Sequence, residues 1–305
     1  MTPIKSALKS ITCVETIHQG QLRLLLNSSL LQTIPYNGFE NERQQLIRYQ
    51  KTEGQIAYFK PSVFGRVYAT GAVGLQAIRK EIRHTLTYGL YVDVDIFNAH
   101  FEILHQVLKH NGYNRTKYIE KYVHDRENCL IDIMEKYNVQ KDAAKALFIQ
   151  LLYGGSFKNW SKSNNVTAQQ GAFIMNFKKE LDAITDVIVD KNPLVLKSIS
   201  KAKGNIKGSV CSFFLQEYEN RILESIYHYC VGQGYITDND CVLCFDGIMI
   251  RADKFNTGLL TEFRNAVRDS MGFSLTFVAK DLSMGYTDAQ LEASQGVLDQ
   301  EGLFD

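Results

Sequence analysis

Two aspartates stand inside short runs of otherwise apolar, β-prone residues, and this feature restricts the fold more than any other in the chain. The runs are LYVDVDI at 90–96, which contains Asp95, and DCVLCFDGIMI at 240–250, which contains Asp246. Their composition and bounding turn residues predict a strand for the first run and a strand, an Asp-Gly turn and a second strand for the second. A buried carboxylate is costly unless it is paired or binds a metal. We therefore expect a sheet that gives both acids a partner.

The acids of these strands are of the type that binds hard divalent cations. Asp93 is a second acid on the first strand, and side-chain alternation places it on the same face as Asp95, so we expect Asp93 to be an accessory ligand. Nucleotidyl transfer requires two divalent ions, such as Mg²⁺ or Mn²⁺, held by carboxylates. Asp95 and Asp246 are the candidates to hold them. An acid at a strand end is also typical of a turn or helix cap, so this interpretation depends on the surrounding segments.

The remaining segments are mainly helical, including most of 113–205. Apolar spacing predicts helices within 41–51, 97–112, 140–155, 208–234 and 255–272, with a final strand in 273–286. The first 60 residues are expected to hold a few helices. This order predicts an α+β fold, in which helices back an antiparallel sheet and a helical subdomain is inserted.

One predicted helix carries a row of residues spaced by four, which places them on one face. The row is Lys141, Lys145, Ile149 and Tyr153, and it is followed by Gly154. Two cations can grip a triphosphate, with Lys145 as a point charge, while the apolar and aromatic side chains meet the base pair. The alternative interpretation is a solvated basic edge beside a core face.

In this order, the segments resemble the motifs of the family A DNA polymerases. The strand that ends in Asp95 and runs on into a helix is similar to the first metal motif, and the hairpin with Asp246 is similar to the third. The second motif reads basic-x-x-x-Lys, seven residues, Tyr-Gly, and it matches 141–154. The resemblance runs from about residue 64 to 286 and includes these further matches: Gly65, Arg66, Leu75, Gln76, Ile78, Ile82, Arg83, Gly208 and Ser209.

The resemblance implies a polymerase right-hand architecture. It implies a reduced thumb or N-terminal region at 1–63, fingers at 105–207, a palm in two parts at 64–104 and 208–286, and a flexible tail at 287–305. It also implies template-directed addition of dNTPs to a primer 3′-hydroxyl by two-metal phosphoryl transfer. Because only about sixty residues precede the matched region, no proofreading exonuclease is expected.

The resemblance also assigns roles to individual residues. Asp95 and Asp246 are the expected catalytic metal ligands, and Arg66, Gln76 and Arg83 are the expected contacts to the DNA primer–template, with surface ion pairs as the plainer role for the arginines. The expected nucleotide contacts are Lys141, Lys145, Ile149, Tyr153, Gly154 and His100.

Three departures from the family pattern leave alternatives open. His100 stands where the family has a Glu that helps exclude ribonucleotides, Ile149 replaces an aromatic residue, and Phe245 and Gly247 replace the His and Glu that flank the third-motif Asp. A single-subunit RNA polymerase or primase is therefore an alternative. A catalytically silent accessory protein that binds DNA or a clamp is another, supported by the missing third-motif Glu.

The tail sequence resembles a clamp-binding peptide. Gln300, Leu303 and Phe304 match the Gln-x-x-Leu-Phe pattern by which bacterial replication proteins dock on the sliding clamp. Two apolar side chains would enter a pocket, and tethering would raise the effective concentration on DNA. This peptide favours DNA synthesis in a bacterial or phage setting.

Composition excludes few classes. The formal net charge is +1, so a local groove would have to bind phosphates. The N-terminus lacks the apolar core of a signal peptide, which predicts a cytoplasmic protein. The resemblance of the tail to a clamp-binding peptide implies that this is the cytoplasm of a bacterial host cell. Cys241 and Cys244 form a C-x-x-C within a buried run without a second ligand pair, so we expect reduced thiols rather than a zinc site.

Overall fold

The computed structural model describes residues 6–32, 41–199, 204–280, 282 and 285–295. They form two compact units, each of which we describe by itself. Of the described residues, 6, 62–66 and 98–221 make up the helical unit, and the others make up the sheet unit. The long helix α11 (Ile206–Gly232) begins in the helical unit and ends in the sheet unit.

The main sheet of the sheet unit carries both predicted aspartates. Its strand order is β5-β6-β4-β7 and all neighbouring strands are antiparallel, and an antiparallel sheet was expected from the sequence. Strand β4 is an inner strand, buried along almost its whole length. The strands are β4 (Tyr91–Ile96), β5 (Cys241–Cys244), β6 (Gly247–Arg251) and β7 (Phe277–Lys280). The last of these is shorter than the run from which it was predicted.

The hairpin turn lies one residue earlier than the sequence suggested. Cys244 pairs with Gly247, so the loop residues are Phe245 and Asp246, and Gly247 already belongs to β6. Phe245 has φ of 58°, a left-handed conformation that is strained for a bulky residue. Its ring contacts the ring of Tyr68 edge-on, with the centroids 5.8 Å apart. This aromatic contact helps to hold the turn in a conformation that usually requires Gly.

A second antiparallel sheet, with order β1-β2-β3, was not predicted. Its strands are β1 (Ser10–Val14), β2 (Gln55–Phe59) and β3 (Tyr68–Ala69). Strand β2 alternates exposed and buried side chains over only five residues, QIAYF. A run this short gives little periodic signal, which is why a few helices and no strand were expected in the first 60 residues.

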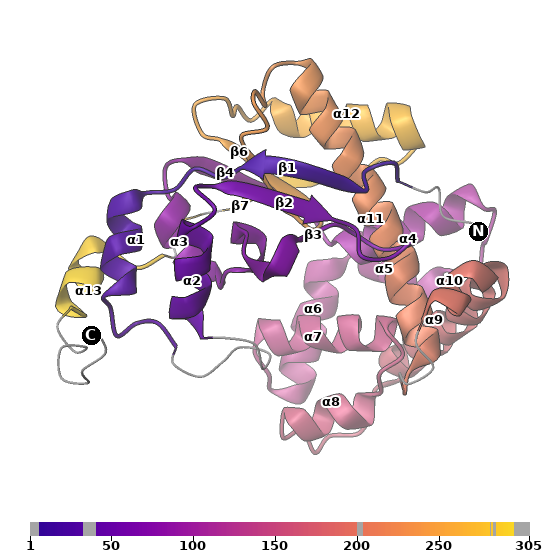
Figure 1. Ribbon diagram of the computed structural model, residues 1–305. Coiled ribbons are helices and arrows are strands. Elements are labelled where there is room, and N and C mark those ends of the chain that lie inside the picture. The colour runs from indigo at the N-terminus through magenta and orange to yellow at the C-terminus, as the bar shows by residue number, and fades with distance from the viewer. Residues whose placement is uncertain (1–5, 33–40, 200–203, 281, 283–284, 296–305) are drawn as a thin grey trace. The chain divides into compact units, whose positions relative to one another are not determined.

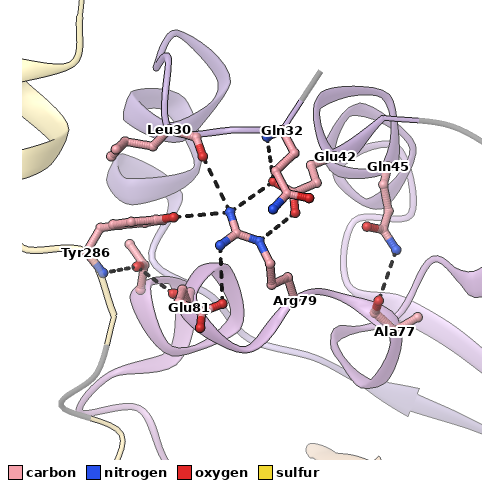
Figure 2. Close-up of polar contacts among 9 residues, drawn as sticks. Leu30, Gln32, Glu42, Gln45, Ala77, Arg79, Glu81 and Tyr286 are labelled. Carbon is pink, nitrogen blue, oxygen red and sulfur yellow. Dashed lines mark hydrogen bonds and ion pairs between the residues drawn. The ribbon is translucent and has the colours of Figure 1, made fainter. Parts of the chain in front are cut away.

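The helices of the sheet unit are joined by a hub at Arg79. Its guanidinium donates to both carboxylate oxygens of Glu42, at 2.6 and 3.0 Å, and to the Tyr286 hydroxyl at 3.1 Å (Figure 2). The hub therefore ties α2, the start of α3 and the C-terminal segment together. The helices are α1 (Gln19–Leu26), α2 (Glu42–Gln50), α3 (Lys80–Thr87), α12 (Leu259–Met271) and α13 (Asp288–Ala293), with 3-10 turns η1 (Thr70–Ala72) and η2 (Leu75–Ala77).

Helix α13 corrects the expectation of a flexible tail that starts at residue 287. A capping box between Thr287 and Gln290 starts the helix, which lies beside α1 (Figure 1). The Gln295 side chain donates to the Leu24 carbonyl at 2.9 Å. Residues 288–295 are therefore anchored to the sheet unit.

The helical unit is built around a cluster of aromatic side chains. Tyr122 stacks on Phe148 with ring centroids 4.1 Å apart, and Phe101 and Phe177 pack edge-on or tilted against them. The prediction of a mostly helical segment over 113–205 is confirmed. The helices are α4 (Ala99–His110), α5 (Lys117–His124), α6 (Arg126–Tyr137), α7 (Lys141–Leu152), α8 (Phe157–Ser163), α9 (Ala172–Lys191) and α10 (Pro193–Ser198).

Candidate nucleotidyl-transfer site

The sheet brings Asp95, on β4, beside Asp246, which lies in the turn just before β6. Asp95 is the register partner of Gly247, the residue that follows Asp246. The Asp246 carbonyl also accepts a hydrogen bond of 3.3 Å from the Ile96 amide. Asp95 is 3% exposed and Asp246 is half-buried. The backbone positions of the two acids are thus adjacent at one end of the β4–β6 pair, although they lie far apart in the sequence.

Gly247 has a physical reason to lack a side chain. A Cβ atom at this position would collide with the Asp95 side chain and with the Val94 carbonyl. The family pattern places an acid directly after the third-motif Asp, and here the Asp95 carboxyl group takes up that space. With Asp95 in this position, Gly247 cannot be replaced by the Glu that the resemblance leads one to expect there.

A lysine already neutralises the first acid. Lys280 of β7 forms an ion pair with Asp95 Oδ2, and in register it lies opposite Asp93. Burial lowers the pKa of Lys280, and Arg83 and Lys80 lower it further, whereas Asp93 opposes them. Asp95 thus binds a cation in this structure without any metal.

Asp93 has an oxygen available for a ligand. It is 1% exposed, and its Oδ1 has no hydrogen-bond partner. Unpaired buried carboxylate oxygens are rare because desolvation is costly. The donor set of Asp93, Asp95 and Asp246 suits a hard divalent cation, and these residues would hold it. Within the described part of the chain, however, no cluster of three or more metal-ligating side chains is preformed.

The surroundings of these acids are apolar apart from a few ionisable groups. Burial raises the pKa of the Cys244 thiol, the Asp93 charge adds to this effect, and Arg83 opposes it. His84 is fully buried and neither ring nitrogen has a hydrogen-bond partner. Its pKa is lowered by burial and by Arg83 and Lys80, so the ring is neutral at pH 7. Sequence reasoning did not single out His84, and no motif marks it.

Cys241 and Cys244 lie on opposite faces of β5, because they are three residues apart in a strand. Cys241 approaches Cys13 of β1, with 3.7 Å between the sulfur atoms. Both thiols of the C-x-x-C are free and buried. This geometry does not allow the two sulfurs to bind one zinc ion.

In the helical unit, α7 places its basic row at the surface. Lys141 pairs with Glu127, and Lys145 Nζ lies 3.1 Å from Asp142 Oδ1. All four of these side chains are at least two-fifths exposed, so the ion pairs are weak. Ile149, on the same row, is also exposed. The two lysines can exchange their present partners for phosphate at little cost.

The end of α7 is fixed against the start of α11. The Tyr153 carbonyl accepts a hydrogen bond of 2.6 Å from the Asn205 amide, and a Cβ at Gly208 would collide with that carbonyl. Gly154 has φ of 77°, which ends the helix in the conformation that favours Gly. The matched glycines 154 and 208 therefore allow a close approach of two helices.

His100 and Arg66 meet at a buried acid that the sequence did not reveal. His100 contacts the Tyr153 hydroxyl through Nδ1 and lies 2.9 Å from Glu219 Oε1 through Nε2. Arg66 Nη1 lies 3.0 Å from Glu219 Oε2. Glu219 lies in a helix of ordinary polar and apolar spacing, and what distinguishes it is its contact with both His100 and Arg66.

Gln76 differs from the expected primer–template contact. Its amide is buried, donates to the carbonyls of Leu243 and Val67 at 2.8 and 3.3 Å, and accepts from the Ala69 amide at 3.0 Å. Both donor hydrogens are thus used inside the sheet unit, so Gln76 braces β5. Arg83 is half-buried near Cys244 and Lys280, where it adds positive charge beside the acids.

The predicted clamp-binding residues Gln300, Leu303 and Phe304 lie outside the described residues. In the part of the chain that the structure describes, no helix has both the length and the apolar character needed to cross a membrane.

Comparison with known proteins gives a distant relative and a partial structural likeness. No family model matches the chain. A Sputnik virophage protein named "Putative helicase V13" is 29% identical over 223 residues, which is 72% of this chain and 28% of that protein. The chain therefore spans about a quarter of that relative's length. The solved POL domain of Pol1 from M. smegmatis, in complex with DNA primer-template and dNTP, is 12% identical with a TM-score of 0.47, over 78% of this chain and 50% of that one.

Proposed function

We propose that this chain is a template-directed DNA polymerase that adds dNTPs to a primer 3′-hydroxyl, and that its sheet and helical units are the palm and fingers of a right-hand architecture. The observation that carries the proposal is the register pairing that sets Asp95 beside the Asp246 turn. It supports the proposal because two acids, one on a strand and one in the adjacent turn, can supply the pair of carboxylates that a two-metal transferase needs.

The residues of the sheet unit would hold the metal ions. Asp95 and Asp246 would bind them and Asp93 would assist, and Lys280 would have to give up its ion pair with Asp95. When bound, Mg²⁺ or Mn²⁺ supplies charge neutralisation at the reacting phosphates. The rigid strands keep the carboxylates in place, which limits the reorganisation that binding requires.

The residues of the helical unit would hold the nucleotide. Lys141 and Lys145 exchange weak surface partners for the triphosphate, and Tyr153 packs at the new base pair. His100 contacts Tyr153 directly and would line the sugar side. Arg66 would contact the primer–template, although one of its nitrogens is held by Glu219.

The proposal is tested by primer extension with purified variants. Asp95→Asn and Asp246→Asn should each lower the rate by about 10³-fold or more, because each removes a metal ligand. Asp253→Asn is the matched control, since Asp253 lies on the surface of the same unit and only pairs with Arg251. Retained DNA binding with no incorporation by the wild type, under any mixture of dNTPs and rNTPs, would instead favour the silent accessory protein.

The name of the virophage relative raises a second candidate, nucleic-acid unwinding. A helicase motor needs a phosphate-binding loop of the G-x-x-x-x-G-K-[ST] type, and the sequence contains no such segment. The region similar to that relative is also only 28% of its length. Polymerisation is therefore the function that this chain's own residues support best.

A further inference from the structure

A connected set of four polar side chains runs through the helical unit. It begins at Arg66, passes through Glu219 of α11 and His100 of α4, and ends at the hydroxyl of Tyr153, just after α7. Glu219 is the central member, with 3.0 Å to Arg66 and 2.9 Å to His100. The set therefore joins three expected functional residues, Arg66, His100 and Tyr153, to an acid with no assigned role.

Glu219 is ionised although it is buried. Its side chain is 2% exposed. Burial alone would raise the pKa of this carboxyl group, but His100 and Arg66 outweigh burial and lower it. A negative charge is thus present beside the imidazole at neutral pH.

That charge decides which nitrogen of His100 carries hydrogen. Nε2 lies 2.9 Å from a carboxylate oxygen, at an angle that departs from a straight hydrogen bond, and only a hydrogen on Nε2 makes this approach favourable. On the other side of the ring, Nδ1 contacts the Tyr153 hydroxyl. The rings lie edge-on, with centroids 5.7 Å apart and planes at 82°. Both side chains are therefore held in one orientation.

We propose that Glu219 is the positioning residue through which this chain discriminates between deoxyribose and ribose. The inference rests on the proposed polymerase function. Position 100 in this chain has an imidazole where the resemblance expects a carboxylate, and the structure supplies a carboxylate to that imidazole from position 219. The imidazole, held by Glu219, occupies the space beside the sugar, and Tyr153 follows its orientation.

Glu217, a neighbouring glutamate, is a control for Glu219 because its contacts indicate a purely structural role. Glu217 lies on the same helix and is fully buried, but it accepts hydrogen bonds from the backbone amides of Ser6 and Gly65, at 2.8 and 2.9 Å. Neither of these amides leads to His100 or Tyr153. Loss of the Glu217 charge should lower stability without changing sugar selection.

The experiment compares Glu219→Gln with Glu217→Gln. The measured quantity is the ratio of dNTP to rNTP incorporation efficiency at a single templated position, together with the melting temperature. Glu219→Gln should lower this ratio by about tenfold, the size expected for one lost charged contact. Glu217→Gln should leave the ratio unchanged, and Glu219→Gln combined with His100→Glu, which returns one carboxylate to the set, should restore it.

A second readout does not depend on catalysis. ¹⁵N NMR of the imidazole should show the Nε2–H tautomer of His100 in the wild type and a shift towards a mixture in Glu219→Gln. An Nδ1–H tautomer in the wild type, or equal changes of the sugar ratio in both glutamate variants, would overturn the Glu219 assignment alone. A wild type with the Nε2–H tautomer that incorporates neither kind of nucleotide would overturn the polymerase function.

Discussion

The acids of the sheet unit and the cations of the helical unit are fixed in opposite ways. Asp93 and Asp95 are almost fully buried, and strand register determines their positions. Lys141 and Lys145 project from a helix surface and pair only with exposed acids. Buried charges are placed before any ligand binds, whereas solvated charges reorganise around it. For the proposed function, the first property suits metal ions and the second suits a nucleotide that must arrive and leave.

The largest expected effect concerns a buried acid of the sheet unit. Glu15 accepts from the Leu75 amide at 2.8 Å and from the Tyr58 hydroxyl, and burial raises its pKa from 4.5 to about 7. The folded state therefore binds more protons than the unfolded state between these values, so this contribution to stability is full below pH 4.5 and is lost as pH rises to about 7. Glu15→Gln removes the titrating carboxyl group, so it should abolish this pH-dependent change in the free energy of unfolding. The change is on the order of 3 kcal/mol in total.

Urea denaturation at several pH values measures that slope. The exposed Glu127 is the matched case from the helical unit, and Glu127→Gln should leave the pH dependence of unfolding nearly unchanged. A wild-type free energy of unfolding that rises steadily from pH 4.5 to 7 would contradict the assignment to Glu15.

The next effect tests how closely β4 and β6 approach. Gly247→Ala introduces a Cβ that meets the Asp95 side chain and the Val94 carbonyl, so the strands must separate. We expect a loss of about 2 kcal/mol in the free energy of unfolding, the usual cost of overpacking. Gly20→Ala is the control, since nothing lies within 4 Å of a Cβ there. Equal stability of the two variants would show that the strands are further apart than described.

The third effect tests the solvated cations. Lys145→Ala should raise the KM for the incoming nucleotide by about tenfold while the melting temperature stays the same, because the lysine has only a weak surface partner. The control is Lys158→Ala on α8, an exposed lysine of the same unit. Steady-state kinetics with one varied nucleotide measure the change, and a lowered kcat with unchanged KM would point to a different role.

The smallest effect concerns Lys280, the cationic side chain that is paired with Asp95. Lys280→Met keeps the aliphatic stem and removes the charge that a divalent ion must displace. Mn²⁺ affinity, measured by electron paramagnetic resonance, should rise by about three- to tenfold. Lys254→Met, at an exposed position of the same unit, is expected to leave it unchanged. A fall in affinity would mean that Lys280 supports the ion rather than competing with it.

The sequence predicted the parts of the fold that have a strong local period. The acidic strand, the hairpin and the long helices were expected because apolar spacing and turn residues mark them. The β1-β2-β3 sheet was missed because its strands are too short to show a period. The turn was placed one residue late because Asp-Gly is a typical turn pair, whereas the actual turn places Phe245 at positive φ.

Some residues of the candidate site could be predicted from the sequence and others could not. Asp95 and Asp246 can be named from the sequence, because acids in apolar strands are conspicuous, but their adjacency depends on strand order. Glu219 and Lys280 could not be named, since each looks ordinary in its own segment and becomes notable only through a partner distant in sequence. The buried role of Gln76 also depends on tertiary contacts, chiefly the one to Leu243.

The crowding at Gly247 limits the routes by which this lineage can change. As long as Asp95 keeps its present side-chain position, an acidic residue cannot be gained at 247 by a single mutation without forcing the strands apart. A further carboxylate at this end of the β4–β6 pair would have to come from another segment, or Asp95 would have to shift first. The order of substitutions open to descendants is thus constrained by one missing methyl group.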